Sequence, residues 1–555
     1  MRKSKKRILV FMAAMMILLG GLSGCNNKAD ENAGKENTAV ESNEGTTDTS
    51  NNTETVDKSI DNLIVGSTMK VETANRTEYN FDVFSGTISQ MALVSQNEDG
   101  SFSPLMAEYE TSDYTTWTFK IIEGLTWHDG TAVTADDVNF TLEYLDKQND
   151  GGYRSKYKDV IVEDDRTLKL ILDAPNTRAL SNLTTMRIIP KHIYEGIENM
   201  ASATEEQATI GCGPYKFERF DANAGVIEFT AYEDYVGGKP NVEKVTVKLF
   251  DNADTMYMAL KNEEIDMVYT YASGIDATAV EDLKSSDNLT VTSIKDTSNT
   301  AVVVFNNNVE PGNNVLIRKA VAKAIDYDKF IELFGSEFSV PSTAGFVPLG
   351  SIGYVETEEN KRDLEEAKNL LEEAGVKDSD GDGIVEYEGA PLEIELLVRS
   401  DKPIYARYAE LLQTNLKEAG IGLTLKNVEV AEFRSISEKE HTNQSMITKF
   451  TAFGMGMGAG MGSAYLDGRG TSNAQGQIMD EEFVKIVDKL KGSASEKEYL
   501  DAAKECQEYY AENVPAIALY WDSYIQAYNK NLSGFVTDGT FGILNMNTWY
   551  SIEKK

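Results

Sequence analysis

The sequence predicts an α/β fold in which large mixed sheets are covered by helices. Strand-like and helix-like segments alternate along the body of the chain, which favours mixed sheets over an all-helical fold. Two strand-like segments, 242–250 and 300–307, are continuous apolar runs of the kind found in buried strands. No short-period repeat is present, which disfavours a solenoid or a propeller. With 555 residues, the chain should contain two or three core-forming units.

The expected elements begin near residue 59. Alternating polar and apolar residues predict half-buried strands at 114–122 and 166–173. Further strands are predicted at 61–69, 242–250, 266–272, 300–307 and 392–398. Helical spacing of apolar residues predicts helices at 253–265, 314–335, 362–375 and 404–420. The last three of these helices end at a glycine, as helix C-termini often do.

The first 25 residues resemble an export signal. Five basic residues among the first seven are followed by an apolar run at 8–22 and then by Ser23-Gly24-Cys25. This run is shorter than the roughly 20 residues that span a bilayer, so a secretory signal is favoured over a membrane helix. The end of the run is similar to the bacterial lipobox, which predicts that Cys25 is lipidated and becomes the mature N-terminus. A plain signal peptide with an incidental cysteine is the alternative.

Residues 26–57 contain only Val40 and Val56 as sizeable apolar residues. Because such a segment cannot bury enough surface to fold, we expect a disordered tether between the lipid and the folded body. A lipid group would then hold the protein on the outer face of a membrane without a transmembrane helix. The formal net charge of −37 argues against nucleic acid and anionic surfaces as partners.

The stretch 126–140 contains one of only three histidines and raises the question of an acid/base or metal centre. Thr134 precedes Asp136 and Asp137 at the start of an apolar helical pattern, which is a capping-box arrangement. His128 precedes an Asp-Gly turn, so we interpret it as a hydrogen-bonded anchor of that turn. The stretch is therefore predicted to be architecture rather than a catalytic centre.

Patterns typical of enzymes are absent from the rest of the sequence. No HExxH, GxSxG or P-loop pattern occurs, and no two histidines have metal-ligand spacing. We therefore do not expect an enzyme; a surface hydrolase is the alternative, although the sequence nominates no residues for it. Cys212 and Cys506 are expected to be free thiols, with a disulfide between them as the alternative.

The segment 378–389 resembles the start of a calcium-binding loop, with alternating carboxylates around a central glycine. Its candidate ligands are Asp378, Asp380, Asp382 and Glu386. The pattern fails at its last position, which is Gly389, so an acidic turn is the favoured interpretation. Any calcium bound there would be structural, and we expect no other cofactor.

Four segments together resemble family-five extracellular solute-binding proteins, the peptide/nickel-type lipoproteins that serve ABC importers. Segment 104–143 is similar to the family's signature block, and 211–220 is similar to its Gly-Pro-Tyr turn. Segment 305–335 resembles a second block, and 514–521 resembles the stretch near the C-terminal hinge. Because the four matches occur in order across the body, their combination is more specific than any one of them.

The resemblance implies a two-lobe periplasmic-binding-protein fold of class II, with three domains and a ligand cleft between lobes that close by hinge motion. The expected parts are a signal peptide at 1–25, a tether at 26–57, the first lobe at 58–104 and 211–300, an inserted domain of that lobe at 105–210, the second lobe at 301–530, and a return to the first lobe at 531–555.

The resemblance also points to a pocket that could hold a ligand. Peptide-binding relatives often hold the ligand's α-ammonium with an Asp in an Asp-Pro context; segment 451–470 lacks Asp-Pro, which puts this anchor in doubt. Rigid aromatic and adaptable methionine side chains would line the pocket. The candidate ligand-binding residues are Tyr269, Tyr271, Phe453, Met455, Met457, Tyr465, Asp467 and Trp521. The aromatic residues could instead occupy core positions. The glycine-rich segment 451–470 could instead be a loop that makes no ligand contact.

The expected protein is thus a monomeric, lipid-anchored receptor that delivers a dipeptide or oligopeptide, unchanged, to the permease and ATPase subunits of an ABC importer. The alternatives are an oligosaccharide or a nickel chelate as cargo, or a surface receptor that passes a peptide signal to a partner. The absence of a suitable histidine from the pocket segments disfavours nickel. The expected location is the extracellular face of the cell membrane, or the periplasm if the source has an outer membrane.

Overall fold

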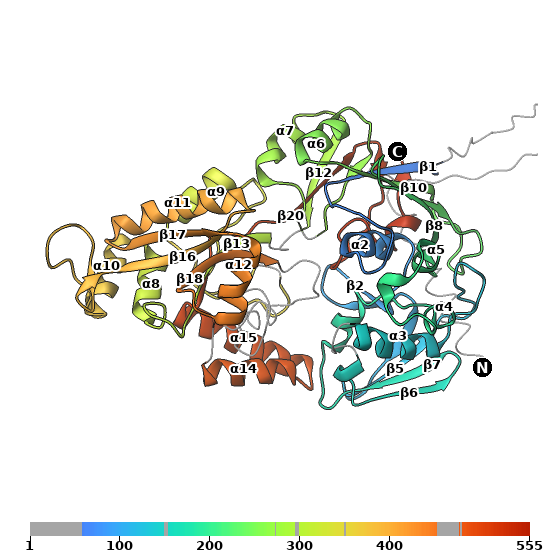
Figure 1. The fold of residues 1–555 in the computed structure, drawn as a ribbon, viewed down its shortest axis with the longest axis horizontal. Coiled ribbons are helices and arrows are strands. Elements are labelled where there is room, and N and C mark those ends of the chain that lie inside the picture. The colour runs from blue at the N-terminus through green and yellow to red at the C-terminus, as the bar shows by residue number, and fades with distance from the viewer. Residues whose placement is uncertain are drawn as a thin grey trace, which may run out of the picture. The chain divides into compact units, whose positions relative to one another are not determined.

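The computed structural model describes residues 58–148, 154–271, 273–294, 299–348, 351–451, 477 and 480–555. Helices and strands alternate through these residues, and the strands form three larger sheets (Figure 1). We call the part that contains the seven-stranded and four-stranded sheets the first lobe, and the part that contains the five-stranded sheet the second lobe.

The seven-stranded sheet has the strand order β12-β20-β11-β1-β10-β9-β8. β1 runs parallel to both of its neighbours, β10 and β11, whereas the remaining pairs are antiparallel. Its strands are β1 (Ile60–Ser67), β8 (Tyr215–Asp221), β9 (Val226–Ala231), β10 (Val242–Leu249), β11 (Met267–Val268), β12 (Leu289–Ile294) and β20 (Tyr524–Asn529). The helices that accompany it are α2 (Tyr79–Ile88), α6 (Ala253–Lys261) and α7 (Val280–Lys284).

The four-stranded antiparallel sheet has the order β4-β5-β7-β6 and follows the short hairpin of β2 (Val94–Gln96) and β3 (Phe102–Pro104). Its strands are β4 (Ala107–Glu110), β5 (Thr116–Ile121), β6 (Asp159–Asp164) and β7 (Thr167–Ile171). The helices next to it in the chain are α3 (Ala135–Gln148), α4 (Lys191–Tyr194) and α5 (Glu205–Thr209). Alternation works as expected here, because Trp117, Phe119 and Ile121 of β5 are buried in one core with the larger sheet.

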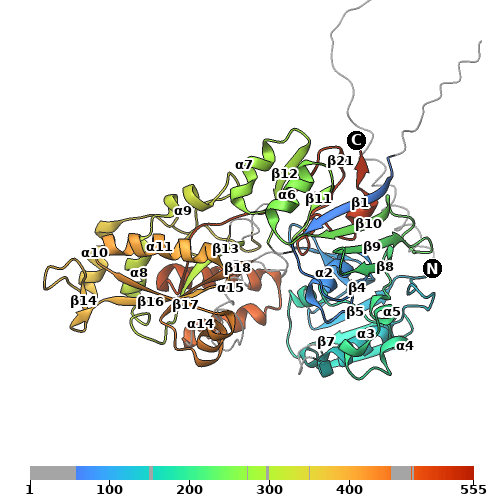
Figure 2. The same ribbon diagram turned by 45° about the horizontal axis from the view of Figure 1, so that its top comes forward.

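The five-stranded sheet has the order β17-β16-β18-β13-β19. Its strands are β13 (Asn299–Phe305), β16 (Glu393–Arg399), β17 (Gly422–Val428), β18 (Ser445–Thr451) and β19 (Ala516–Ala518), and a small hairpin is formed by β14 (Glu386–Tyr387) and β15 (Ala390–Pro391). The surrounding helices are α8 (Val315–Ala324), α9 (Tyr327–Phe334), α10 (Leu364–Glu373), α11 (Pro403–Glu418), α12 (Val430–Arg434), α14 (Glu481–Lys491) and α15 (Glu496–Asn513). Figure 2 shows helices on both sides of this sheet.

The helix predicted at 314–335 is wrong in one respect, because it consists of two helices, α8 and α9. Ile325 between them has extended backbone angles, and the carboxylate of Asp326 accepts a hydrogen bond from the N–H of Lys329 at 3.0 Å. This side-chain cap starts a new helix, which apolar spacing alone does not reveal. The strand predicted at 266–272 is also too long, since β11 pairs only at Met267 and Val268.

The chain returns to the first lobe earlier than the expected position 531. β20 begins at Tyr524 and pairs with both β12 and β11 of the seven-stranded sheet, so the stretch 524–530 belongs with the first lobe. After β20, the short strands β21 (Leu532–Ser533) and β22 (Glu553–Lys554) pair with each other. Trp549 is fully buried and donates a hydrogen bond from Nε1 to the carbonyl of Thr87 at 2.8 Å, which fastens the C-terminal segment to α2.

Candidate functional site

Two parallel strands of the first lobe, β1 and β11, end at the same edge of their sheet. The segments that follow them meet there, since the N–H of Tyr271 lies 3.3 Å from the sulfur of Met69. In open α/β sheets, ligands bind beyond the carboxyl ends of parallel strands, because loops from neighbouring strands converge there without covering each other. The end of β1 and β11 is therefore a candidate position for a ligand site.

Three aromatic rings from distant parts of the sequence gather at this edge. Tyr79 starts α2, Tyr271 follows β11, and Phe541 lies in the C-terminal segment. The ring of Tyr271 lies 6.3 Å from that of Tyr79 and 5.6 Å from that of Phe541, measured between centroids. Tyr79 is 65% exposed, so its ring offers a free apolar surface next to two rings that are held in place.

A buried arginine lies beside these rings. Arg187 is 6% exposed, its guanidinium carbon lies 4.9 Å from the centroid of Phe541, and its Nη1 donates to the carbonyl of Thr184 at 3.2 Å. Its Nε is buried without a hydrogen-bond partner among the described residues. The guanidinium fits only because residue 86 in α2 is a glycine: a Cβ there would lie 1.8 Å from Nε. A positive charge with unused donor capacity is thus held in place by close packing.

Two carboxylates face this arginine. Burial raises the pKa of Asp538 to about 6, although the N–H groups of Thr540 and Phe541 donate to it at 2.6 and 2.8 Å. Burial also raises the pKa of Asp82, while the charges of Arg187 and Arg76 oppose that shift. The site therefore carries both signs of charge at partly desolvated positions, where each charge interacts more strongly than it would in water.

The hollow next to Arg187 has a volume of about 400 Å³. We call it the Arg187 pocket. Its lining residues are Arg76, Thr77, Tyr79, Asp82, Leu145, Gln148, Thr185, Met186, Arg187, Ile189, Asn199 and Met200. Polar and charged side chains make up most of this lining, and Leu145, Met186, Ile189 and Met200 supply its apolar part. Polar groups that converge on one hollow can fix the orientation of a small polar ligand.

The described candidate residues have different surroundings. Tyr271 belongs to the aromatic group beside the Arg187 pocket. Tyr269 is 1% exposed and packs against Phe84 at 6.1 Å between ring centroids, and its hydroxyl is buried without a partner among the described residues. Trp521 is 3% exposed and packs against Phe346 in the core of the second lobe. Tyr269 and Trp521 thus lie buried in the cores of the two lobes, and a role of either residue in ligand binding stays a prediction.

The other predicted ligand contacts lie outside the described residues. These are Phe453, Met455, Met457, Tyr465 and Asp467, and Cys25 lies outside them as well. Their roles stay predictions. Cys212 and Cys506 are both buried, one in each lobe, and no disulfide joins them.

The predicted interpretation of 126–140 as architecture is confirmed. The Nε2 atom of His128 lies 3.0 Å from the carbonyl of Gly213, and its Nδ1 accepts from the N–H of Gly211 at 3.1 Å. A ring that accepts at Nδ1 and donates at Nε2 is neutral, and burial lowers the pKa of His128 to about 4. His128 therefore joins two chain segments as a neutral anchor.

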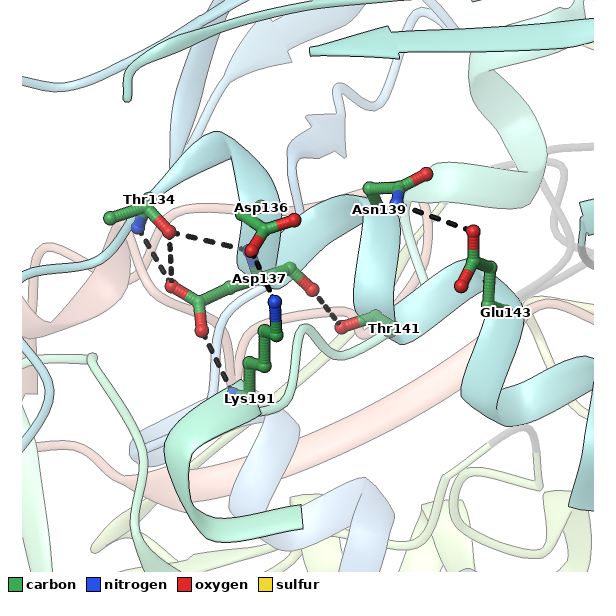
Figure 3. A network of polar contacts seen from close by, with 7 residues as sticks. All are labelled: Thr134, Asp136, Asp137, Asn139, Thr141, Glu143 and Lys191. Atoms are coloured by element: carbon green, nitrogen blue, oxygen red, sulfur yellow. Dashed lines mark hydrogen bonds and ion pairs between the residues drawn. The ribbon is translucent and has the colours of Figure 1, made fainter. Parts of the chain in front are cut away.

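The capping box at the start of α3 is formed by Thr134 and Asp137 (Figure 3). The N–H and hydroxyl of Thr134 donate to Asp137 at 2.8 and 3.0 Å, and the N–H of Asp137 lies 3.4 Å from the Thr134 hydroxyl. The other oxygen of Asp137 accepts from the N–H of Lys191 at 2.9 Å, so the box also holds the start of α4. Asp136 instead forms a surface ion pair with the Lys191 amine.

The four candidate calcium ligands lie together, with one carboxylate oxygen from each within 4.8 Å of the others. Several of these oxygens already accept backbone hydrogen bonds: Gly381 donates to Asp378 at 2.7 Å, and Ile384 donates to Asp382 at 2.8 Å. These bonds form the acidic turn that the sequence favours, and calcium binding stays a prediction.

Sequence reasoning missed Arg187, Tyr79, Phe541 and Asp538. One signal was available: Arg187 is a single charge between the apolar residues Met186 and Ile188, a context in which a charge must find a partner if it is buried. No comparable signal marks Tyr79 or Phe541, because only the folded chain brings α2 and the C-terminal segment together.

The family model described as bacterial extracellular solute-binding proteins, family 5, middle region, matches residues 101–475. The oligopeptide-binding protein AppA of Bacillus subtilis is 23% identical over 99% of both chains. A curated relative from Brucella ovis is 27% identical, and the match covers 60% of this chain but only 62% of that relative.

Solved structures show the same fold. The Clostridium difficile protein AppA has a TM-score of 0.75 at 23% identity, covering 88% of this chain and all of that chain. NikA of Brucella suis, solved with Fe(III)-EDTA, has a TM-score of 0.77 at 21% identity, covering 89% of this chain and all of that chain. These likenesses confirm the predicted α/β, two-lobe fold. Within the described residues, no helix combines the length and the apolar character needed to cross a bilayer.

Proposed function

The chain belongs to family 5 of the bacterial extracellular solute-binding proteins, and from this we propose that it captures a peptide outside the cell membrane and delivers it to an ABC importer. Relatives over most of the chain support this cargo, since AppA and DppE of Bacillus subtilis are named oligopeptide-binding and dipeptide-binding proteins. A solved AppA structure from the same organism, with a TM-score of 0.71, contains a nonapeptide.

The observation that carries the proposal is the Arg187 pocket. A peptide offers carboxylates for a fixed guanidinium, an ammonium group for Asp82, and side chains for the rings of Tyr79 and Tyr271. The guanidinium of Arg187 is held in place before the ligand arrives, by its close contact with Gly86 and its stacking on Phe541. Binding therefore loses little free energy to the ordering of this side chain. None of the three histidines lines this pocket, which disfavours a histidine-held nickel chelate.

Mass spectrometry of the protein purified under native conditions would identify the compound it carries. Isothermal titration with a random nonapeptide pool, with a maltooligosaccharide mixture and with nickel plus histidine would then compare the three classes of cargo. We expect binding of the peptide pool alone, with loss of affinity in Arg187→Met. Binding of only the sugar or the nickel complex would contradict the cargo and leave the family assignment intact.

We further propose that the ligand leaves the protein chemically unchanged and that the chain does not act as an enzyme. The proposal rests on the family and on the architectural role of the 126–140 stretch. Incubation of the bound peptide followed by mass spectrometry should recover the same mass. A cleaved peptide, with cleavage abolished by a single substitution, would contradict this.

The third part of the proposal is that Cys25 carries a lipid and that 26–57 is the spacer between membrane and body. Its support is the basic and apolar N-terminal sequence, which ends at Ser23-Gly24-Cys25. Cys25→Ser should prevent incorporation of labelled fatty acid and release the protein from the membrane fraction. Membrane retention of the serine variant would contradict lipid anchoring.

A further inference from the structure

The two lobes touch at a place far from the chain crossings that join them. The chain passes between the lobes after β12 and before β20, in the region where α7 and α9 face a common groove. The other contact joins the segment that follows β7 to α15 and to the turn between α14 and α15. The backbone N–H of Thr177 donates there to the carbonyl of Ser493 at 3.3 Å.

Arg178 lies at the centre of this second contact. Its guanidinium carbon lies 4.7 Å from the ring centroid of Phe102 in its own lobe and 5.9 Å from the ring centroid of Tyr499 in α15. Its Nη2 donates to the carbonyl of Gly100 at 3.0 Å. The cation is thus placed between an aromatic ring of each lobe, an arrangement that attracts a flat, weakly hydrated guanidinium.

Gly100 completes the contact from the first lobe. A Cβ at this position would lie 1.8 Å from the Cδ1 atom of Ile352, so the second lobe packs directly on the glycine backbone. The φ angle of Gly100 is +77°, which a residue with a side chain rarely adopts. The carbonyl of Gly100 therefore accepts a hydrogen bond from Arg178, and the side chain of Ile352 packs against the Cα atom of the same glycine.

We infer that Arg178, Gly100, Tyr499 and Ile352 form a latch that holds the lobes closed at the side opposite their chain crossings. None of these residues lines the Arg187 pocket. The latch therefore sets the equilibrium between open and closed forms directly, without contacting the ligand. Because a ligand enclosed by the lobes binds the closed form better, a change in the latch alters its apparent affinity through that equilibrium.

The first test uses the full-length protein without ligand. We expect Arg178→Ala to accelerate amide hydrogen exchange in peptides that cover Thr177 and Ser493, and to increase the radius of gyration measured by X-ray scattering. Arg166→Ala is the matched control, since Arg166 donates from Nε to the carbonyl of Ile121 within its own sheet. Unchanged exchange at both peptides in Arg178→Ala would overturn the latch.

A double-mutant cycle separates the contact from general damage to the fold. Arg178→Ala and Tyr499→Leu should accelerate exchange at Thr177 by similar factors, and the double variant should differ little from either one. Fully multiplicative effects would show that the two residues act independently, which contradicts the latch. The melting temperature of each variant identifies any that fail to fold, and Arg178→Lys, which retains the charge but loses the flat group, should give an intermediate effect.

The affinity measurement rests on the proposed function and can fail separately. With the nonapeptide pool, Arg178→Ala should weaken binding by about 2- to 30-fold, chiefly through faster dissociation. If exchange accelerates but neither the unaltered protein nor the variant binds peptide, the latch stands and the peptide cargo is wrong. If peptide binding is unchanged while the lobes open, the latch does not control capture, and the inference is overturned.

Discussion

Gly86→Ala tests the geometry of the Arg187 pocket without removing any of its polar groups. Gly86 lies inside α2, and its missing side chain leaves room for the Arg187 guanidinium. A Cβ would lie 1.8 Å from Nε and 2.2 Å from Nη2, both far shorter than the ordinary contact distance. The guanidinium must then move by at least about 1.5 Å to restore van der Waals separation.

The expected effects on binding and on folding differ in size. A charge-assisted hydrogen bond from a fixed arginine is worth about 1.5–3 kcal/mol, so its displacement should weaken ligand affinity about 10- to 150-fold. Folding should change much less, because alanine is better than glycine in a helix by about 1 kcal/mol, which offsets part of the cost of crowding at this position. Stability and affinity are therefore expected to separate in this variant.

Isothermal titration with the ligand identified by mass spectrometry measures the affinity, and urea unfolding measures the stability. Gly196→Ala is the matched control, since a Cβ there would meet no atom within 4 Å. An affinity loss below about threefold in Gly86→Ala, with folding intact, would refute the idea that Arg187 holds the ligand from a fixed position.

Three further predictions concern the first lobe: the buried His128, the capping box at the start of α3, and the exposed ring of Tyr79. Burial lowers the pKa of His128 to about 4, so the stabilising effect of the neutral ring is fully present above pH 6.5 and is lost as the pH falls. The difference in unfolding free energy between the unaltered protein and His128→Asn should therefore shrink by up to about 3 kcal/mol between pH 7.5 and 4.5. A difference that stays constant with pH would contradict this. Asp137→Ala should lower the free energy of unfolding in urea by about 2–3 kcal/mol, because it leaves the N–H groups of Thr134 and Lys191 unpaired. Asp136→Ala should lower it by less than about 0.5 kcal/mol, and equal losses of stability in the two variants would refute the assigned roles. Tyr79→Ala should weaken ligand binding about tenfold in titration while leaving the melting temperature unchanged, because its ring is 65% exposed; a large drop in that temperature would instead indicate a structural role.

Local patterns in the sequence identified several features that depend on nearby residues alone. The capping box of Thr134 and Asp137 could be read directly, because its partners are three positions apart on one helical turn. The helix predicted at 404–420 is α11, whose apolar spacing reports one buried face. The break between α8 and α9 was missed, since a side-chain cap at Asp326 does not disturb that spacing.

The Arg187 pocket depends on contacts between residues far apart in the chain. Tyr79, Arg187 and Phe541 are separated by more than 100 residues from one another and meet only in the folded chain, where the ring of Tyr271 lies beside those of Tyr79 and Phe541 and Arg187 lies against Phe541. The predicted site residues Tyr269 and Trp521 are apolar enough for either a pocket or a core, and the sequence could not distinguish the two. Burial in the folded chain placed both of them in cores.

The sequence by itself determined the family, the α/β class and the architectural role of the His128 stretch. The family followed from the resemblance of four ordered segments. The class and the role of the His128 stretch followed from local periodicity, caps and turns, which depend on neighbours within a few positions. Tertiary structure alone decided which charges face one another, where Gly86 makes room for Arg187, and where the lobes touch through Arg178. The physical reason is that the strength of a charge or a ring contact depends on distance and desolvation, and both are set by packing between segments that the sequence order keeps apart.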